Sequence, residues 1–223
     1  SKKVENKYQE LVINDAYLNR QLNTFNKPSY DYLRSVTLYI ANIKDETKNE
    51  GSVGTGVLVK QIKDISFIIT NNHVCSKEDE GHCFVLIKEG NEVKKVSLEY
   101  IKKSELVDLT LWKTDEYLEN KRAIRGASRN LNIQEPVYSV GNYLGVPMIY
   151  SEGTFAGYQE ADVLFNLPCA PGCSGSGVFN QEGELVAIIY AGNMVSPIQM
   201  DTAKIRAIDP TFINMFLEDI FNE

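Results

Sequence analysis

The sequence predicts an all-β protein, built from antiparallel sandwiches or barrels, with one helix at each end. Short runs rich in β-branched and aromatic residues recur along the 223-residue chain, separated by turns of Gly, Asn and charged residues. These runs do not alternate with long amphipathic helices, which argues against a parallel α/β sheet. A polar, charged stretch over 114–132 has few strand formers and separates an earlier set of strands from a later one.

This pattern divides the chain into five segments. They are an N-terminal helical extension over 1–29, a first β unit over 30–115, a linker over 116–132, a second β unit over 133–208 and a C-terminal helix over 209–223. Apolar residues at steps of three and four predict the first helix, and Pro28 ends its pattern. That helix either packs on the main domain or serves as an oligomerisation or tethering arm.

The apolar runs indicate individual strands. Gly54–Val59 and Ile65–Thr70 flank a polar turn, which is typical of a hairpin, and a β-branched and aromatic run over 36–43 precedes them. Further strands are expected over 84–88, 93–100, 110–113, 137–140, 150–158, 163–166, 177–179 and 185–191. Apolar residues at helical spacing follow Pro210 and predict the final helix.

Composition and charge exclude several classes of partner. With 43% hydrophobic and 24% charged residues, the chain has the balance of a folded protein and not of a disordered one. The net charge of −7 disfavours phosphate backbones, so we expect no nucleic-acid partner. The longest apolar runs, such as Leu185–Ala191, fall far short of the ~20 residues that cross a bilayer, so we expect no membrane span.

The sequence leaves the compartment open. The chain begins with Ser1 and not with Met, so we expect it to be trimmed or processed. A missing signal peptide then carries little weight, and an exported or envelope location and an intracellular one both remain compatible with the sequence.

Two titratable residues next to expected strands are candidates for chemistry. His73 follows the apolar run that ends at Thr70, so a sheet would hold its backbone while its ring reaches a cleft. Asp108 lies between Val107 and Leu109, and a carboxylate among apolar neighbours is costly to bury unless it is paired. An imidazole N–H is one stable partner. Taken singly, each has an ordinary structural explanation, as a core histidine and as an Asp that binds backbone amides.

A glycine-rich turn supplies a third candidate. Gly172 and Gly175 flank Cys173 and Ser174, and glycines permit a tight turn with unusual φ. Such a turn can expose the Ser174 hydroxyl and direct the N–H groups of Gly172, Cys173 and Ser174 into one concavity, which suits an oxyanion. A serine nucleophile needs an adjacent base, and that base needs an acid to orient it. The order His73, Asp108, Ser174 therefore predicts a catalytic triad, although an ordinary Gly/Ser turn is the structural alternative.

Five motifs join these candidates. They are GTGVL at 54–58, IITNNHV at 68–74, DLTL at 108–111, VYSVGNYLG at 137–145 and PGCSGSGVF at 171–179. On these motifs, residues 35–208 resemble the trypsin-like (chymotrypsin-fold) serine peptidases. The pattern is nearest to that of the compact bacterial high-temperature-requirement type and its viral and phage relatives.

The resemblance implies a fold and a mechanism. It implies two perpendicular, antiparallel, six-stranded β-barrels with the site between them, and a serine endopeptidase that acts through an acyl-enzyme. His73 would be the general base and then the acid, Asp108 the orienting acid and Ser174 the nucleophile, with oxyanion donors on Gly172 and Ser174. A polypeptide is the implied substrate, and no cofactor or metal is required.

The resemblance also indicates where a substrate side chain would bind. In this fold the segment before the nucleophile and a strand some 15–20 residues after it wall the primary pocket. The corresponding residues are Leu167, Pro168, Ala170, Tyr190, Ala191 and Gly192. None is acidic, so we expect a small or apolar side chain before the scissile bond. Residues 190–192 would also offer an extended edge to the substrate backbone.

The four cysteines admit several states. Cys75 with Cys83 and Cys169 with Cys173 could form disulfides, or all four could be reduced. Cys75, His82 and Cys83 give only a partial zinc set without Cys-x2-Cys spacing, so we expect no metal. Cys173 is one position out of register for a thiol nucleophile, because cysteine relatives of this fold carry sulfur in the place of Ser174.

Two functional alternatives remain. The chain could keep the fold as a catalytically silent binding or scaffold protein. It could also be a protease that cuts its own precursor once, which the Ser1 start permits.

Overall fold

The fold is taken from a computed structural model that describes residues 27–128, 130–196 and 199–222. The helical extension predicted over 1–29 therefore lies almost wholly outside the described residues, and its role in assembly stays a prediction. The elements, in chain order, are α2 (Tyr30–Val36), β1 (Thr37–Asp45), β2 (Glu50–Ile62), β3 (Ile65–Thr70), β4 (Cys83–Glu89), β5 (Glu92–Ser97), β6 (Glu99–Lys103), β7 (Thr110–Thr114), β8 (Pro136–Gly141), β9 (Ile149–Gln159), β10 (Asp162–Asn166), β11 (Gly177–Phe179), β12 (Leu185–Ser196), β13 (Gln199–Ile208) and α3 (Pro210–Phe221). Two 3₁₀ turns lie at Lys77–Asp79 and Tyr143–Gly145. In these ranges no helix is long and apolar enough to cross a membrane.

The second β unit is a closed barrel of six antiparallel strands. Its order is β10-β13-β12-β11-β8-β9, and its interior is filled by buried side chains such as Phe155, Phe165 and Ile189. This barrel confirms one of the two that the sequence predicted. Strand β13 was not predicted from its sequence, because its polar residues match a strand poorly.

The first β unit is an open sheet of seven strands, in the order β5-β4-β1-β2-β3-β7-β6, so a second closed six-stranded barrel is not confirmed. Its edge strands, β5 and β6, are consecutive in the chain and meet at Leu98, which is buried and donates its N–H to the Cys83 carbonyl at 3.2 Å. The two edges are thus joined by the chain itself and not by a ladder of hydrogen bonds. A single strand expected over 93–100 is for the same reason split in two.

The first β unit begins with a short helix that the sequence did not reveal. Helix α2 starts where the Ser29 hydroxyl accepts the Tyr32 N–H at 3.1 Å, and it ends as the chain enters β1 at Thr37. Its seven residues bury Tyr32, Leu33 and Val36. Two turns of helix are too short for a periodic pattern to be recognised.

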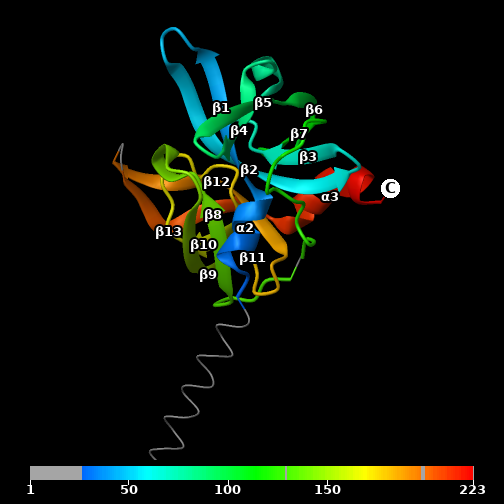
Figure 1. Cartoon of the computed structure of the whole chain (residues 1–223). Coiled ribbons are helices and arrows are strands. Elements are labelled where there is room, and N and C mark those ends of the chain that lie inside the picture. The colour runs from blue at the N-terminus through cyan, green and yellow to red at the C-terminus, as the bar shows by residue number, and fades with distance from the viewer. Residues whose placement is uncertain (1–26, 129, 197–198, 223) are drawn as a thin grey trace, which may run out of the picture.

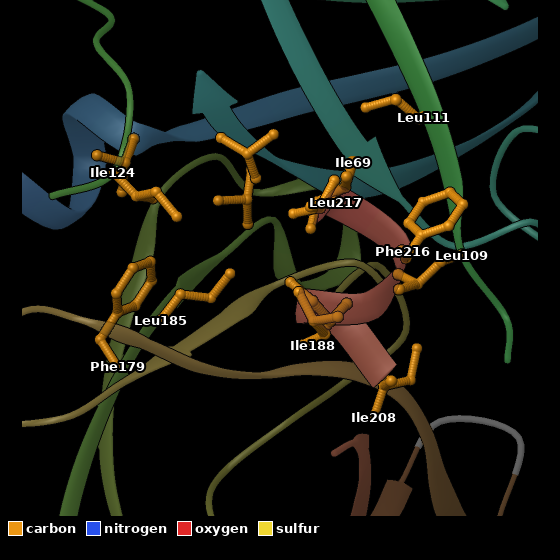
Figure 2. Close-up of a cluster of buried hydrophobic side chains, with 14 of the residues drawn as sticks. Ile69, Leu109, Leu111, Ile124, Phe179, Leu185, Ile188, Ile208, Phe216 and Leu217 are labelled. Atoms are coloured by element: carbon orange, nitrogen blue, oxygen red, sulfur yellow. The ribbon is translucent and has the colours of Figure 1, made fainter. Parts of the chain in front are cut away.

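A separate group of buried side chains lies between the two β units (Figure 2). Ile69 and Leu111 come from the first sheet and Leu109 from the segment just before β7, whereas Phe179, Leu185, Ile188 and Ile208 come from the barrel. In Figure 1 the first sheet lies above the barrel, with α3 beside the region where they meet. This shared core, called the seam below, fixes one unit against the other.

The predicted C-terminal helix is present as α3 and closes the seam. Its start is capped by the Asp209 carboxylate, which accepts the Thr211 N–H at 2.7 Å, and Pro210 occupies its first turn. Lys60 and Lys102, from strands β2 and β6, donate to carbonyls in its last turns. Cations suit this end of a helix because the macrodipole is negative there.

Replacing Leu217 with Ala should test the seam. Leu217 is fully buried there, so truncation leaves a cavity that should cost about 2–5 kcal/mol of unfolding free energy. Urea unfolding followed by circular dichroism measures the loss. Met215→Ala on the same helix is the control, because Met215 is 54% exposed and its truncation should cost less than about 0.5 kcal/mol. Equal losses of unfolding free energy in the two variants would contradict the claim that packing of Leu217 in the seam stabilises the fold.

Candidate active site

Strand pairing brings two of the candidate residues together. Strands β3 and β7 are antiparallel neighbours, and Thr70 at the end of β3 pairs with Thr110 at the start of β7. The chain after β3 and the chain before β7 therefore leave the sheet at the same edge. His73 and Asp108 lie on these two segments, each within three residues of its strand.

The Asp108 carboxylate contacts both the ring and the backbone of His73. One oxygen, Oδ2, lies 2.5 Å from His73 Nδ1, and the other, Oδ1, accepts the His73 N–H at 3.1 Å. The Asn71 side chain holds the same segment by donating to the Asp108 carbonyl at 2.9 Å. With Nδ1 facing the carboxylate, Nε2 is the nitrogen available to a substrate or a hydroxyl. The His73 side chain is 49% exposed, so it is accessible.

The environment favours the ionised form of Asp108. Burial alone would raise the pKa of its carboxyl. The hydrogen bond and charge of the His73 ring, together with backbone N–H groups of His73 and Asn72, outweigh burial, and the pKa lies below its ordinary value of 3.8. Asp108 can therefore orient and stabilise a protonated imidazole.

Ser174 lies in the glycine turn that precedes β11. Gly172 and Gly175 have φ of +101° and +90°, which L side chains rarely adopt. A Cβ at Gly175 would also overlap the Thr55 carbonyl oxygen, so the turn packs directly on β2. The barrel side is fixed by the Gly175 N–H, which donates to the Ile189 carbonyl at 2.8 Å.

The turn of Ser174 meets the segment of His73 across Gly54. The Thr55 N–H donates to the Ser174 carbonyl at 2.9 Å. A Cβ at Gly54 would lie 3.3 Å from that same carbonyl oxygen and 2.6 Å from the side chain of Val74. The structure thus places His73, Asp108 and Ser174 on neighbouring segments. Within the described residues the Ser174 hydroxyl makes no hydrogen bond to His73, and such bonds commonly tighten only with substrate bound.

The three amides predicted as oxyanion donors differ in their bonding. The Cys173 N–H donates to the Ala170 carbonyl at 3.0 Å, so it is already engaged. The N–H groups of Gly172 and Ser174 have no acceptor among the described residues. Those two amides are the ones that remain for a ligand.

The residues predicted to wall a pocket also differ. Leu167 is fully buried in the barrel core, so the structure corrects the expectation that its side chain lines a pocket. Pro168 is exposed, whereas Ala170, Tyr190 and Ala191 are partly buried, and Gly192 continues strand β12.

An acid that the sequence analysis missed lies beside this pocket wall. The Tyr190 hydroxyl donates to Asp162 Oδ1 at 2.7 Å. Burial and this carboxylate raise the pKa of Tyr190 to about 12. Asp162 is 28 positions away in sequence, and it lies close to Tyr190 because their strands, β10 and β12, both pair with β13.

The structure pairs all four cysteines. Cys75 binds Cys83 with Cα atoms 6.3 Å apart, and Cys169 binds Cys173 with Cα atoms 6.0 Å apart. The first pair takes both sulfurs out of the partial zinc set. The second closes a loop that ends one residue before Ser174.

Comparison with known proteins identifies the family. Residues 54–188, more than half of the chain, match the trypsin-like peptidase domain. Two curated relatives named serine protease HtrA-like are 29% identical: that of Staphylococcus epidermidis RP62A over 67% of this chain and 28% of its own, and that of Staphylococcus aureus USA300 over 80% and 26%. The chain thus spans about a quarter of the length of these relatives.

Solved structures support the same fold. An HtrA-type protease AlgW with a tripeptide superposes with a TM-score of 0.67 at 18% identity, covering 86% of this chain and 64% of that one. A serine endoprotease from Yersinia pestis gives 0.66 at 18% identity, covering 88% and 68%. The resemblance seen in the sequence motifs is confirmed, and the chain belongs to the trypsin-like peptidase domain family.

Proposed function

We propose that this chain is a serine endopeptidase that cleaves polypeptides through an acyl-enzyme, with His73, Asp108 and Ser174 as its triad. The observation that carries the proposal is the 2.5 Å contact of His73 Nδ1 with Asp108 Oδ2, beside the turn that presents Ser174. Membership of the trypsin-like peptidase domain family, and relatives named as serine proteases, support it.

The proposed first step is a proton transfer coupled to attack. His73 Nε2 removes the proton of Ser174 Oγ as that oxygen bonds to the substrate carbonyl carbon. Asp108, whose pKa lies below its ordinary value of 3.8 so that it is ionised at neutral pH, stabilises the imidazolium that forms. His73 then returns the proton to the leaving amine as the C–N bond breaks, and water repeats the sequence on the acyl-enzyme.

The developing negative charge on the substrate oxygen needs preorganised donors. The N–H groups of Gly172 and Ser174 are proposed for this role, since neither donates to another described residue. The amide of Cys173 is excluded because it binds the Ala170 carbonyl.

We propose a small or apolar side chain as the residue before the scissile bond. Pro168, Ala170 and Ala191 offer small, apolar walls that are at least partly accessible. Asp162, an acid beside this wall, already accepts the Tyr190 hydroxyl, so it is a poor partner for a substrate cation. Residues 190–192 lie beyond the part of β12 that pairs with β11, and this side of the strand would pair with the substrate backbone.

Replacing Ser174 with Ala should lower turnover by roughly 10⁴–10⁶-fold and leave the fold intact, because it removes only the attacking oxygen. A fluorophosphonate probe, read by mass spectrometry, should form one adduct on the parent and none on the variant. Ser176→Ala is the matched control: its hydroxyl is fully buried, so labelling should persist. A parent that never labels would favour the silent scaffold, and a Ser174→Ala protein that cleaves at the parent rate would exclude the triad.

The Asp108 carboxylate should contribute stability that depends on pH. Because its folded pKa lies below its ordinary value, this contribution is present above about pH 4 and is lost as pH falls through the folded pKa. Urea unfolding at pH 5 and pH 3 should therefore show the difference between the parent and Asp108→Asn shrinking at the lower pH. Glu105→Gln, an exposed change on the same loop, is the control. A difference that grows on acidification would contradict the lowered pKa.

A further inference from the structure

A chain of fully buried polar side chains crosses the seam beneath the Ser174 turn. Its members are Thr55 and Thr70 from the first sheet and Asn142, which follows strand β8 of the barrel. Buried polar groups in a seam otherwise lined by apolar residues are costly unless every partner is in place. Their hydrogen bonds therefore identify the backbone segments that these side chains fix in place.

Asn142 ties a loop of the barrel to the first sheet. Its side-chain Nδ2 lies 3.1 Å from the carbonyls of Leu38 and Gly54 and from the Thr55 hydroxyl. Its Oδ1 accepts the Met148 N–H at 3.2 Å, which closes the loop over 142–148. The whole loop is thus fixed against strands β1 and β2.

Thr55 holds the Ser174 turn at two carbonyls. Its hydroxyl donates to the Gly172 carbonyl at 2.9 Å, and its backbone N–H donates to the Ser174 carbonyl at 2.9 Å. The hydroxyl also accepts the backbone N–H of Asn142 at 3.2 Å. One side chain therefore links the first sheet, the 142–148 loop and the turn.

The planarity of the peptide group converts these contacts into directions for the amides. In a trans peptide the N–H points opposite to the preceding C=O, so fixing the carbonyl fixes the amide. The Pro171 carbonyl accepts the N–H of Leu144, which directs the Gly172 N–H away from the 142–148 loop. The Gly172 carbonyl faces Thr55, which directs the Cys173 N–H toward Ala170 and out of the oxyanion role.

We infer that Thr55 and Asn142 are positioning residues that hold the Pro171–Cys173 peptides in the orientation a working oxyanion site needs. This inference rests on the proposed peptidase function. Neither side chain touches the reacting atoms: Thr55 acts through the Gly172 carbonyl, and Asn142 acts through the loop that presents the Leu144 N–H. A flip of the Gly172–Cys173 peptide would break the hydrogen bond from Thr55, which joins the two β units, and a flip of the Pro171–Gly172 peptide would break the bond from Leu144 within the barrel unit.

The test removes the Thr55 hydroxyl and keeps its shape. Thr55→Val should lower kcat by about 10–10²-fold with KM within about threefold. The reason is that misdirected amides weaken binding of the charged transition state much more than binding of the substrate. The rate of labelling by the fluorophosphonate should fall in parallel. Thr55→Ser restores the hydroxyl and should recover most of the turnover.

Thr37→Val is the matched control for a purely structural loss. Thr37 is also a fully buried threonine, and its hydroxyl donates to the Leu33 carbonyl at 2.7 Å, away from the Ser174 turn. It should lower the unfolding midpoint without changing kcat. If Thr55→Val does not fold, Tyr39→Phe serves instead, since it removes only the hydroxyl that holds the Gly145 carbonyl at 2.9 Å. A smaller loss of kcat, about 2–10-fold, is expected.

The outcomes separate the two proposals. A parent that neither turns over peptides nor labels at Ser174 overturns the proposed function and this inference together. A parent that labels, with Thr55→Val or the substitute Tyr39→Phe labelling and turning over equally fast, overturns only the positioning role. An equal loss of kcat in Thr37→Val would also overturn it, because a general loss of stability would then explain the effect.

Discussion

The apolar seam between the open sheet and the closed barrel is the constraint on which the candidate site depends. His73 and Asp108 belong to the sheet, Ser174 belongs to the barrel, and no single unit contains all three. Burial of Ile69, Leu109 and their neighbours against Ile188 and Ile208 fixes the two units at one distance and angle. Close packing of such a core resists small displacements, so it holds the segments of His73 and Asp108 in a constant position relative to the segment of Ser174.

Polar contacts refine what the seam positions coarsely. Hydrophobic burial is non-directional, so it brings surfaces together without orienting individual peptides. The hydrogen bonds of Thr55 and Asn142 supply direction, and they act on the backbone immediately before Ser174. The Cys169–Cys173 disulfide and the positive φ of Gly172 act on the same short turn. Several independent restraints thus converge on a few peptide groups.

Local patterns predicted well those features that local chemistry controls. The barrel strands, the C-terminal helix and the family were read from alternation, spacing and five short motifs, and the comparisons confirm the family. The sequence did not predict helix α2 or strand β13, because the seven residues of α2 are too few and the residues of β13 too polar to form a recognisable pattern. The expected second closed barrel became an open sheet whose edges meet at Leu98.

The site shows the same difference between features that depend on single residues and features that depend on the whole fold. Residue type and strand-end context were enough to make His73, Asp108 and Ser174 the candidates for base, acid and nucleophile, because these roles depend on the chemistry of single side chains. Three features became known only from the folded structure: Leu167 is buried, Asp162 contacts Tyr190, and Thr55 binds the Gly172 carbonyl. The two hydrogen bonds join residues 28 and 117 positions apart, and the burial of Leu167 depends on all the core residues around it. Local sequence patterns cover only a few neighbouring residues, so they could not predict these contacts.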